Sequence, residues 1–362
     1  MAGRFVLSGL ARLFSAVTEF RAGLYQRGYL RQHRLQHPTI SVGNLSVGGT
    51  GKTPIVACLA EQLIDLGYRP FILSRGYRGS AESSVEVVSD GSRILSTPDR
   101  CGDEPFLLAK TVPAARIVVG SKRWKAARAL GEPGSKTIYL MDDGFQHLQL
   151  FRDLNILGVD ATRSPWTDAP LPKGRLREPL VAMQRADIVI LSRTHHLGVD
   201  RMGEMIHKLN TSLPQIPVFP FSHQIKDLFN LQNARPVPID LLREKRWVVL
   251  AAIGNPKQFL LDVQQADGTI VGQALYRDHH RFSVRDLADL ASTCQETAAD
   301  AVLTTEKDAV RLSLPDDFPC PVYTLRIQAV DRSQTQFKSW LCDWLCRLDP
   351  KTDSSATGKT PK

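Results

Sequence analysis

Short apolar runs alternate with helical patterns through the first half of the chain. The runs occupy residues 39–43, 70–73, 116–119, 137–141, 154–159 and 187–191. A continuous apolar run of this length, followed by a helix, is typical of a strand that is buried on both faces of a parallel sheet. The pattern predicts a doubly wound α/β/α domain, in which helices cover both faces of the sheet.

A second series of apolar runs follows at residues 247–253, 270–275, 301–304 and 322–325. These runs also alternate with helices, which predicts a smaller α/β domain. Between the two series, Pro236 and Pro238 are mixed with charged residues, as is typical of a linker. The predicted order is a first domain at 38–222, a linker at 223–245 and a second domain at 246–348. Residues 349–362 have almost nothing apolar to bury, so we expect a disordered tail.

Residues 1–37 are the most basic stretch of the chain. Apolar residues recur there at steps of three and four and form one stripe along a helix: Val6, Leu10, Leu13, Phe14, Val17, Phe20 and Leu24. Six arginines, among them Arg12 and Arg21, accompany a single acidic residue, Glu19. These charges interrupt the roughly 20 apolar residues of a spanning helix and the apolar core of a signal peptide. The segment is predicted as a basic amphipathic helix that either lies on an anionic membrane surface or packs on the protein's own body.

The overall composition is that of a folded soluble protein. The chain has 362 residues, of which 43% are hydrophobic and 23% charged, and its formal net charge is +9. These values exclude a disordered chain, a collagen and a polytopic membrane protein. The six cysteines form no CxxC pair, so we interpret them as reduced thiols of a cytosolic protein. We predict no nucleic-acid partner, because no basic cluster outside the front segment is interleaved with aromatic residues.

A glycine-rich loop follows the first predicted strand. It consists of Gly48, Gly49, Thr50, Gly51, Lys52 and Thr53, and a helical pattern comes after it. Strand, glycine-rich loop and helix in this order are the context of a phosphate-binding P-loop. Its backbone N–H groups surround phosphate oxygens, Lys52 reaches the outer phosphates, and Thr53 can hold Mg²⁺. Ser46 replaces the glycine that usually stands six residues before the lysine, so the loop is an atypical variant.

Two adjacent aspartates, Asp142 and Asp143, end another predicted strand. A P-loop enzyme needs a carboxylate at such a strand end to organise its metal ion. Because adjacent side chains leave a strand in different directions, one aspartate can face Mg²⁺ while the other faces a second metal ion, water or the lysine. Together with the loop, the pair predicts a metal-dependent nucleotide site.

Ordered strings along the chain carry a resemblance to a known family. They are Ser41–Asn44, Gly48–Pro54, Ser74–Gly79, Gly102–Pro105, Asp142–His147, Gly174–Pro179, Asp278–His280 and Thr305–Val310. In this order they closely resemble the tetraacyldisaccharide 4'-kinase family, which phosphorylates the lipid A precursor of Gram-negative bacteria. The strings run from residue 41 to residue 310 and so cover most of the chain.

The resemblance implies a reaction and a location. The reaction is transfer of the γ-phosphate of ATP, with Mg²⁺, to the 4'-hydroxyl of a tetraacylated glucosamine disaccharide 1-phosphate. The location is the cytoplasmic face of the bacterial inner membrane, with residues 1–37 as a peripheral anchor.

The rival function is a membrane-associated P-loop ATPase or GTPase that acts as a switch and has no lipid substrate. Guanine specificity is unsupported, because residues 301–308 lack the Asn-Lys-x-Asp order of GTPases.

A sugar hydroxyl needs a carboxylate or an imidazole to accept its proton during phosphoryl transfer. Asp103 precedes Pro105 at the start of a helical pattern, where an aspartate is also common as a simple helix cap. The resemblance favours Asp103 as the catalytic base, with Glu104 supporting the metal or the substrate. His279 and His280 are adjacent and cannot share one orientation, so we expect only His279 to enter the site and pair with Asp103.

Four loop arginines are candidates for binding the substrate. Arg75, Arg78, Arg175 and Arg177 lie in glycine-containing loops, where a guanidinium can clamp a phosphate with two bonds. Loop arginines are more often plain surface charges, and the resemblance is what favours binding, first at Arg75 and Arg177. Gln146 is a further substrate-binding candidate. It and His147 either support the metal aspartates or form a structural pair.

Overall fold

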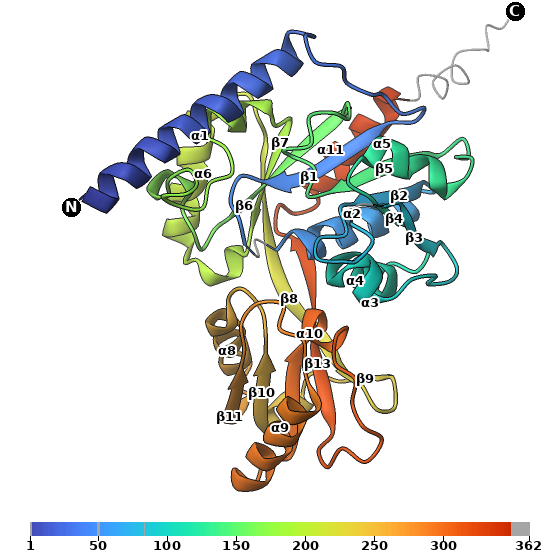
Figure 1. Cartoon of the computed structure of the whole chain (residues 1–362), viewed down its shortest axis with the longest axis vertical. Coiled ribbons are helices and arrows are strands. Elements are labelled where there is room, and N and C mark those ends of the chain that lie inside the picture. The colour runs from blue at the N-terminus through green and yellow to red at the C-terminus, as the bar shows by residue number, and fades with distance from the viewer. Residues whose placement is uncertain (1, 49–50, 83, 349–362) are drawn as a thin grey trace, which may run out of the picture.

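The computed structural model describes residues 2–48, 51–82 and 84–348, with side chains from residue 6 onward. One continuous sheet runs through both halves of the molecule (Figure 1). Its strands lie in the order β11 (Thr269–Leu275), β10 (Arg246–Ala251), β12 (Ala301–Thr305), β13 (Val322–Asp331), β8 (Val218–Asn230), β7 (Ile188–Ser192), β6 (Leu154–Asp160), β1 (Thr39–Asn44), β5 (Thr137–Asp142), β2 (Arg69–Ser74), β4 (Arg116–Val119) and β3 (Glu86–Asp90), with β9 (Arg235–Val237) paired to β8. The predicted α/β class is confirmed.

The first domain holds the strands from β8 to β3. Neighbouring strands are parallel from β8 to β4, and only the edge strand β3 runs antiparallel to its neighbour. The helices of this half are α2 (Lys52–Asp65), α3 (Pro98–Cys101), α4 (Asp103–Thr111), α5 (Arg123–Ala126) and α6 (Val199–Ser212), with 3₁₀ turns η1 (Ala127–Leu130), η2 (Pro165–Thr167), η3 (Leu180–Arg185) and η4 (Thr194–His196). The apolar runs located all of these strands except β3 and β8.

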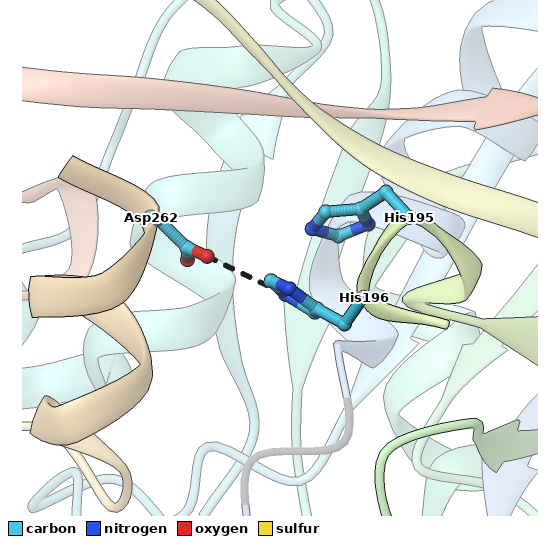
Figure 2. Close-up of side chains that lie close together, drawn as sticks. All are labelled: His195, His196 and Asp262. Carbon is cyan, nitrogen blue, oxygen red and sulfur yellow. Dashed lines mark ion pairs between the residues drawn. The ribbon is translucent and has the colours of Figure 1, made fainter. Parts of the chain in front are cut away.

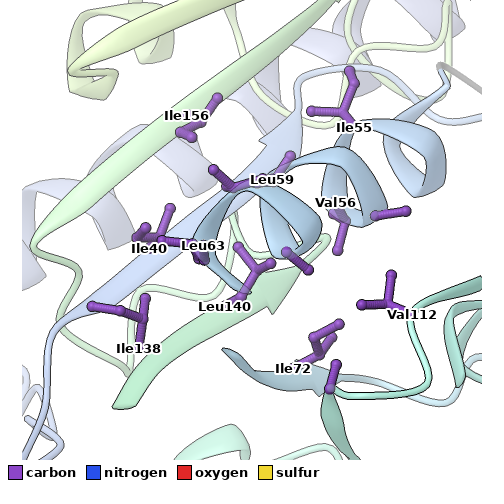
Figure 3. Packing of buried hydrophobic residues seen from close by; sticks show 14 of the residues in the cluster. Ile40, Ile55, Val56, Leu59, Leu63, Ile72, Val112, Ile138, Leu140 and Ile156 are labelled. Carbon is purple, nitrogen blue, oxygen red and sulfur yellow. The ribbon is translucent and has the colours of Figure 1, made fainter. Parts of the chain in front are cut away.

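The P-loop helix α2 forms the centre of the largest core. Its buried side chains, including Ile55, Leu59 and Leu63, pack against Ile40 of β1 and Ile156 of β6 (Figure 3). A separate cluster around Phe145 and Leu209 of α6 covers the opposite face of the sheet. Burial on both faces explains why these strands are apolar at successive positions rather than alternating.

The second domain repeats this layering on a smaller scale. Strands β11, β10, β12 and β13 are parallel. Helix α8 (Pro256–Gln265) contributes Phe259 and Val263 to the core on one face, and α9 (Val284–Glu296) contributes Leu290 and Cys294 to the core on the other. The short helices are α7 (Leu241–Glu244) and α10 (Glu306–Ala309).

Two long strands connect the halves. Strand β8 pairs in parallel with β7 at residues 218–220 and then in antiparallel with β13 from Phe221 to Asn230. The stretch predicted as a linker, residues 223–245, therefore contains most of β8 together with β9 and α7. Pro220 hid this strand, because a proline within a run argues against a central strand.

The assignment of residues 246–348 to the second domain is wrong at its C-terminal end. After β13 the chain returns to the first domain as α11 (Gln336–Leu348). Phe337, Leu341 and Leu345 are buried in the same core as α2. An amphipathic helix shows in its sequence that one face is buried, but it does not show which core receives that face.

Helix α1 (Ala2–Gln26) lies across the end of the first domain that is remote from the second domain (Figure 1). Ala11, Ala22 and Tyr25 are buried, whereas the predicted apolar stripe faces outward, with exposed fractions of 62% at Leu13 and 70% at Phe20. Within the described part of the chain, no helix is both long and apolar enough to cross a membrane.

We predict that Phe337→Ala destabilises the first domain, because Phe337 is fully buried and contacts the rings of Phe219 and Phe221. The cavity should lower the free energy of unfolding by about 3–5 kcal/mol, measured by chemical denaturation. Lys338→Ala, on the exposed face of the same helix, is the matched control. Equal stability of the two variants would contradict the placement of α11 in this core.

Candidate active site

The P-loop joins the end of β1 to the start of α2. Gly48 and Gly51 have φ angles of +106° and +76°, which favour glycine, while Gly49 and Thr50 lie outside the described residues. A Cβ atom at Gly51 would come within 2.1 Å of Cε1 of His223, so a side chain is excluded there by space as well. Lys52 is buried, and its Nζ atom donates to Asn44 Oδ1 at 3.0 Å.

The two aspartates lie at the end of the neighbouring strand β5, beside the P-loop. Asp142 lies opposite Val42 in the parallel register of β1 and β5 and is fully buried. Its Oδ2 atom accepts a hydrogen bond from Ser74 Oγ at 3.2 Å. Asp143 turns away with a φ of +52° and pairs with Lys52 Nζ at 3.3 Å and Arg177 Nη1 at 2.7 Å. The predicted divergence of the two side chains is what the structure shows.

The surroundings of the two carboxyl groups give them opposite acidities. Burial, reinforced by the charges of Glu104 and Asp143, raises the pKa of Asp142 to about 7. Burial opposes ionisation of Asp143 too, but Lys52 and Arg177 outweigh it and lower the pKa of Asp143 to about 2. Among the described residues none forms an ion pair with Asp142, although the charge of Lys52 acts to lower its pKa.

The residues present fit a hard divalent cation at Asp142. Its Oδ1 atom is buried and has no hydrogen-bond partner within the described ranges. Buried polar atoms are normally partnered, so this oxygen is a candidate ligand for a cation. Carboxylate and hydroxyl oxygens, such as those of Asp142, Glu104 and Thr53, are the ligands that Mg²⁺ prefers.

The second domain contributes to the same site. His279 Nδ1 lies 2.8 Å from Oδ2 of Asp103, the first residue of α4. Gly102 occupies the N-cap position, so the alternative of Asp103 as a simple cap is wrong. His280 turns away, with Nε2 3.1 Å from Asp286 Oδ2 at the start of α9. The structure therefore brings together the pair that was expected from the sequence, across 176 residues of chain.

Two cations beside this pair were missed by sequence reasoning. Arg311 Nε lies 3.3 Å from Asp103 Oδ2. Lys307 Nζ lies 3.2 Å from His279 Nε2 and 3.4 Å from Glu104 Oε1. Both residues follow strand β12: Lys307 lies within the string Thr305–Val310, and Arg311 comes directly after it. Polar residues after a buried parallel strand gather at the ligand-binding edge of the sheet, so this string was the sequence signal for both cations.

The candidate substrate residues separate into two groups. Arg177 lies beside Asp143, and Gln146 donates to Asn44 O at 2.9 Å and Glu178 Oε2 at 3.1 Å, so both adjoin the P-loop and the aspartates. The other three arginines are exposed. Arg75 pairs with Glu82, Arg175 pairs with Asp168, and Arg78 donates to the carbonyl oxygen of Asp278.

Arg123 is a further buried cation that the sequence did not reveal. Only 4% of it is exposed, and its Nε atom has no hydrogen-bond partner in the described parts of the chain. Burial lowers its pKa to about 10, while Asp143 and Asp142 act in the opposite direction. At the start of the short helix α5, this arginine looks like an ordinary surface residue in the sequence.

A second cluster at the domain contact contains His195, His196 and Asp262 (Figure 2). Burial and the neighbouring His196 lower the pKa of His195 to about 4, so its ring is neutral at pH 7. Its Nδ1 atom accepts the N–H of His223 at 3.1 Å, which places the single ring proton on Nε2. The cluster joins the two domains, with His196 Nε2 3.4 Å from Asp262 Oδ1, and its ligand atoms lie within 4.8 Å of one another.

Comparisons with known proteins agree over nearly the whole chain. A model of the tetraacyldisaccharide-1-P 4'-kinase family matches residues 3–346. The tetraacyldisaccharide 4'-kinase of Syntrophus aciditrophicus is 39% identical over 325 residues, covering 88% of this chain and 87% of the relative. The enzyme of the same name from Pelobacter propionicus is 38% identical over 300 residues, covering 83% of this chain and 81% of the relative.

A solved structure is similar as well. The "apo" form of LpxK from Aquifex aeolicus in complex with ATP aligns with a TM-score of 0.76 and 29% identity. The alignment covers 95% of this chain and 99% of that chain, so it includes both domains.

We predict that Asp142→Asn changes how stability depends on pH in the metal-free protein. The pKa of Asp142 is raised to about 7 on folding from 3.8, so the folded state binds the extra proton between these values. The wild type should therefore lose stability as pH rises from about 4 to 7, by at most about 1.4 kcal/mol per pH unit from this group. Unfolding midpoints measured across this range should fall less steeply in the variant. Parallel profiles would contradict the assigned environment.

Proposed function

The chain belongs to the tetraacyldisaccharide-1-P 4'-kinase family, and we propose that it transfers the γ-phosphate of ATP to the 4'-hydroxyl of a tetraacylated glucosamine disaccharide 1-phosphate. One observation carries the chemical part of the proposal. The Asp103–His279 pair, which the second domain completes, adjoins the aspartates beside the P-loop lysine, because the charge of Glu104, next to Asp103, acts on Asp142. A phosphate donor and a proton acceptor are thus provided together.

On the ATP side, the nucleotide is held by the loop from Gly48 to Thr53. Lys52 binds the outer phosphates in place of Asn44 and Asp143, its partners in this structure. Thr53 and Asp142 would hold Mg²⁺, with Asp143 and Glu104 nearby. The bound ion would neutralise charge on the outer phosphates. Support comes from the unpartnered Asp142 oxygen and from the ATP complex of the Aquifex protein.

On the lipid side, Asp103 accepts the proton of the 4'-hydroxyl. Its Oδ2 atom faces both His279 and Arg311, while Oδ1 has no hydrogen bond to any described residue. The Lys307 ammonium beside His279 Nε2 makes that nitrogen an acceptor, so the ring proton is on Nδ1 and points to Asp103. The imidazole therefore orients the carboxylate, and the free Oδ1 is available to the substrate.

The substrate phosphate has its own candidates. Arg75 and Arg78 are exposed on the loop after β2, next to the contact with the second domain, and can receive the 1-phosphate. Arg175 is exposed on the loop after η2. Arg177 and Gln146 lie beside the P-loop instead. Arg177 donates to Asp143, and Gln146 donates to the backbone oxygen of Asn44.

We place the enzyme on the cytoplasmic face of the inner membrane through α1. The outward apolar stripe and the exposed Arg12 and Arg21 on the same helix suit insertion among anionic lipid head groups. A groove of about 370 Å³ lies between α1 and the loop at Ala169, Pro170 and Lys173. It offers acyl chains a path along the membrane-facing side of the domain.

The rival function, a P-loop switch without a lipid substrate, is tested by following the labelled γ-phosphate of ATP. The purified protein is incubated with Mg²⁺-ATP and tetraacyldisaccharide 1-phosphate in mixed micelles. We expect the label on the lipid. Label recovered only as free phosphate would refute the kinase and support the switch.

In this assay Lys52→Ala should lower kcat by about 10²-fold or more, as for the loss of one preorganised charge elsewhere. The reason is that Lys52 supplies the buried ammonium nearest the phosphate loop. Lys338→Ala, a lysine on the surface of α11, serves as the control. Near-normal turnover of the Lys52 variant would eliminate the P-loop assignment.

Asp103 and His279 should act as one unit, because they share a hydrogen bond. Each alanine variant should be severely slowed, and the double variant should be little slower than the slower single variant. The Michaelis constant for ATP should change little. Rate losses that multiply would show that the two residues act independently.

Charge reversal at Arg12 and Arg21 to Glu should weaken binding to vesicles containing anionic lipid. Each arginine near such a surface contributes about 1 kcal/mol, so a loss above tenfold is expected in a sedimentation assay. High salt should have the same effect on the wild type. Val17→Ala with Phe20→Ala tests insertion separately. Unchanged binding in both variants would place the anchor elsewhere.

A further inference from the structure

Arg311 occupies an unusual place at the contact between the domains. It follows α10 in the second domain, and only 9% of its side chain is exposed. Its Nε atom lies 3.3 Å from Oδ2 of Asp103 in the first domain, and the two groups form an ion pair without hydrogen-bond geometry. The same oxygen receives His279 at 2.8 Å, so two groups from the second domain fix one oxygen of a first-domain carboxylate.

The second domain holds Arg311 rigidly. Its Nη2 atom pairs with Oδ1 of Asp308, a residue with no exposed surface. Asp308 is held in turn, because its Oδ2 atom accepts the N–H of Ala252 at 3.0 Å and the hydroxyl of Thr305 at 2.8 Å. The guanidinium therefore cannot follow Asp103 and instead determines where that carboxylate comes to rest.

Arg311 also holds the segment that carries the histidine. Its Nη1 atom donates to the carbonyl oxygen of His280 at 2.8 Å, and Nη2 reaches that of Ala252 at 3.3 Å. The backbone N–H of His279 donates to the same Ala252 oxygen at 3.0 Å. His279 has a φ of +62°, a strained backbone conformation that needs such support.

We infer that Arg311 is a positioning residue for phosphoryl transfer: it holds Oδ2 of Asp103 and the backbone around His279 so that Oδ1 of Asp103 faces the substrate hydroxyl when the domains are together. This inference rests on the proposed function. Lysine can replace the fork only in part, because the ammonium is a point charge without the fixed, planar donors that reach the four oxygen partners of Arg311 at once.

The alternative is that Arg311 merely ties the domains together. Arg281 provides a matched control, because it forms another interdomain ion pair, with Asp99 at 3.2 Å, but does not contact Asp103. If interdomain attraction alone mattered, Arg281→Met would resemble Arg311→Met.

The test compares Arg311→Met, Arg311→Lys and Arg281→Met in the lipid phosphorylation assay. Arg311→Met should lower kcat by about 10²-fold with little change in the Michaelis constant for ATP, as for other preorganised groups. Arg311→Lys should recover part of the loss, and Arg281→Met should retain wild-type kcat. Equal kcat in Arg311→Met and the wild type, or an equal loss in Arg281→Met, would overturn the inference.

A second measurement separates positioning from folding. Arg311→Met leaves the buried Asp308 unpaired, so Arg311→Met with Asp308→Asn is prepared as well to remove the stranded charge. In an Asp103→Asn background, adding Arg311→Met should lower kcat by less than about threefold, because residues acting through one another are not additive. A full additional loss there would overturn the inference. A wild type that leaves the lipid unlabelled would instead refute the proposed function.

Discussion

The contact between Asp103 and His279 depends on one sheet being shared by two domains. The chain enters the second domain through β8 and leaves it through β13, and these strands are paired to each other. After β13, α11 is buried beside α2 in the first core. The second domain is therefore attached at both ends of its chain. Relative motion must bend a hydrogen-bonded ribbon rather than swing about a single loop, and His279 returns to the same carboxylate.

The site balances buried carboxylates against buried cations. Asp143 is paired with Lys52 and Arg177, and Asp103 is paired with Arg311. Asp142 forms no ion pair with any residue of the described ranges, and burial raises the pKa of its carboxyl group to about 7 against the opposing charge of Lys52. The proposed divalent ion would favour ionisation of Asp142 without competing with an ion pair, which is why the metal proposal centres on Asp142 rather than on Asp143.

What the sequence predicted well was local. Apolar runs located the central strands, and the glycine spacing before Lys52 located the phosphate loop, because each signal lies within a few residues. The partner of Asp103 lies 176 residues away, so its identification needed a family resemblance. Arg123 had no local signal, since a buried arginine and a surface arginine look alike until the fold shows what covers them. For Arg311 the only signal was its place directly after the polar string that follows β12. Strand β8 was missed because a local signal was misleading: Pro220 argues against a strand at a position where the structure has one.

Helix α1 exposes its large apolar side chains and buries small ones. The helix lies at the far end of the first domain, and its exposed apolar stripe points away from the body. Its buried face consists of small or amphipathic residues such as Ala11, Ala22 and Tyr25, which allow close packing without using the large apolar side chains. Burying those side chains against the protein would have been the more favourable outcome in water. The exposed stripe is therefore the observation that supports the proposed contact with a lipid surface, where the substrate of the proposed reaction would lie.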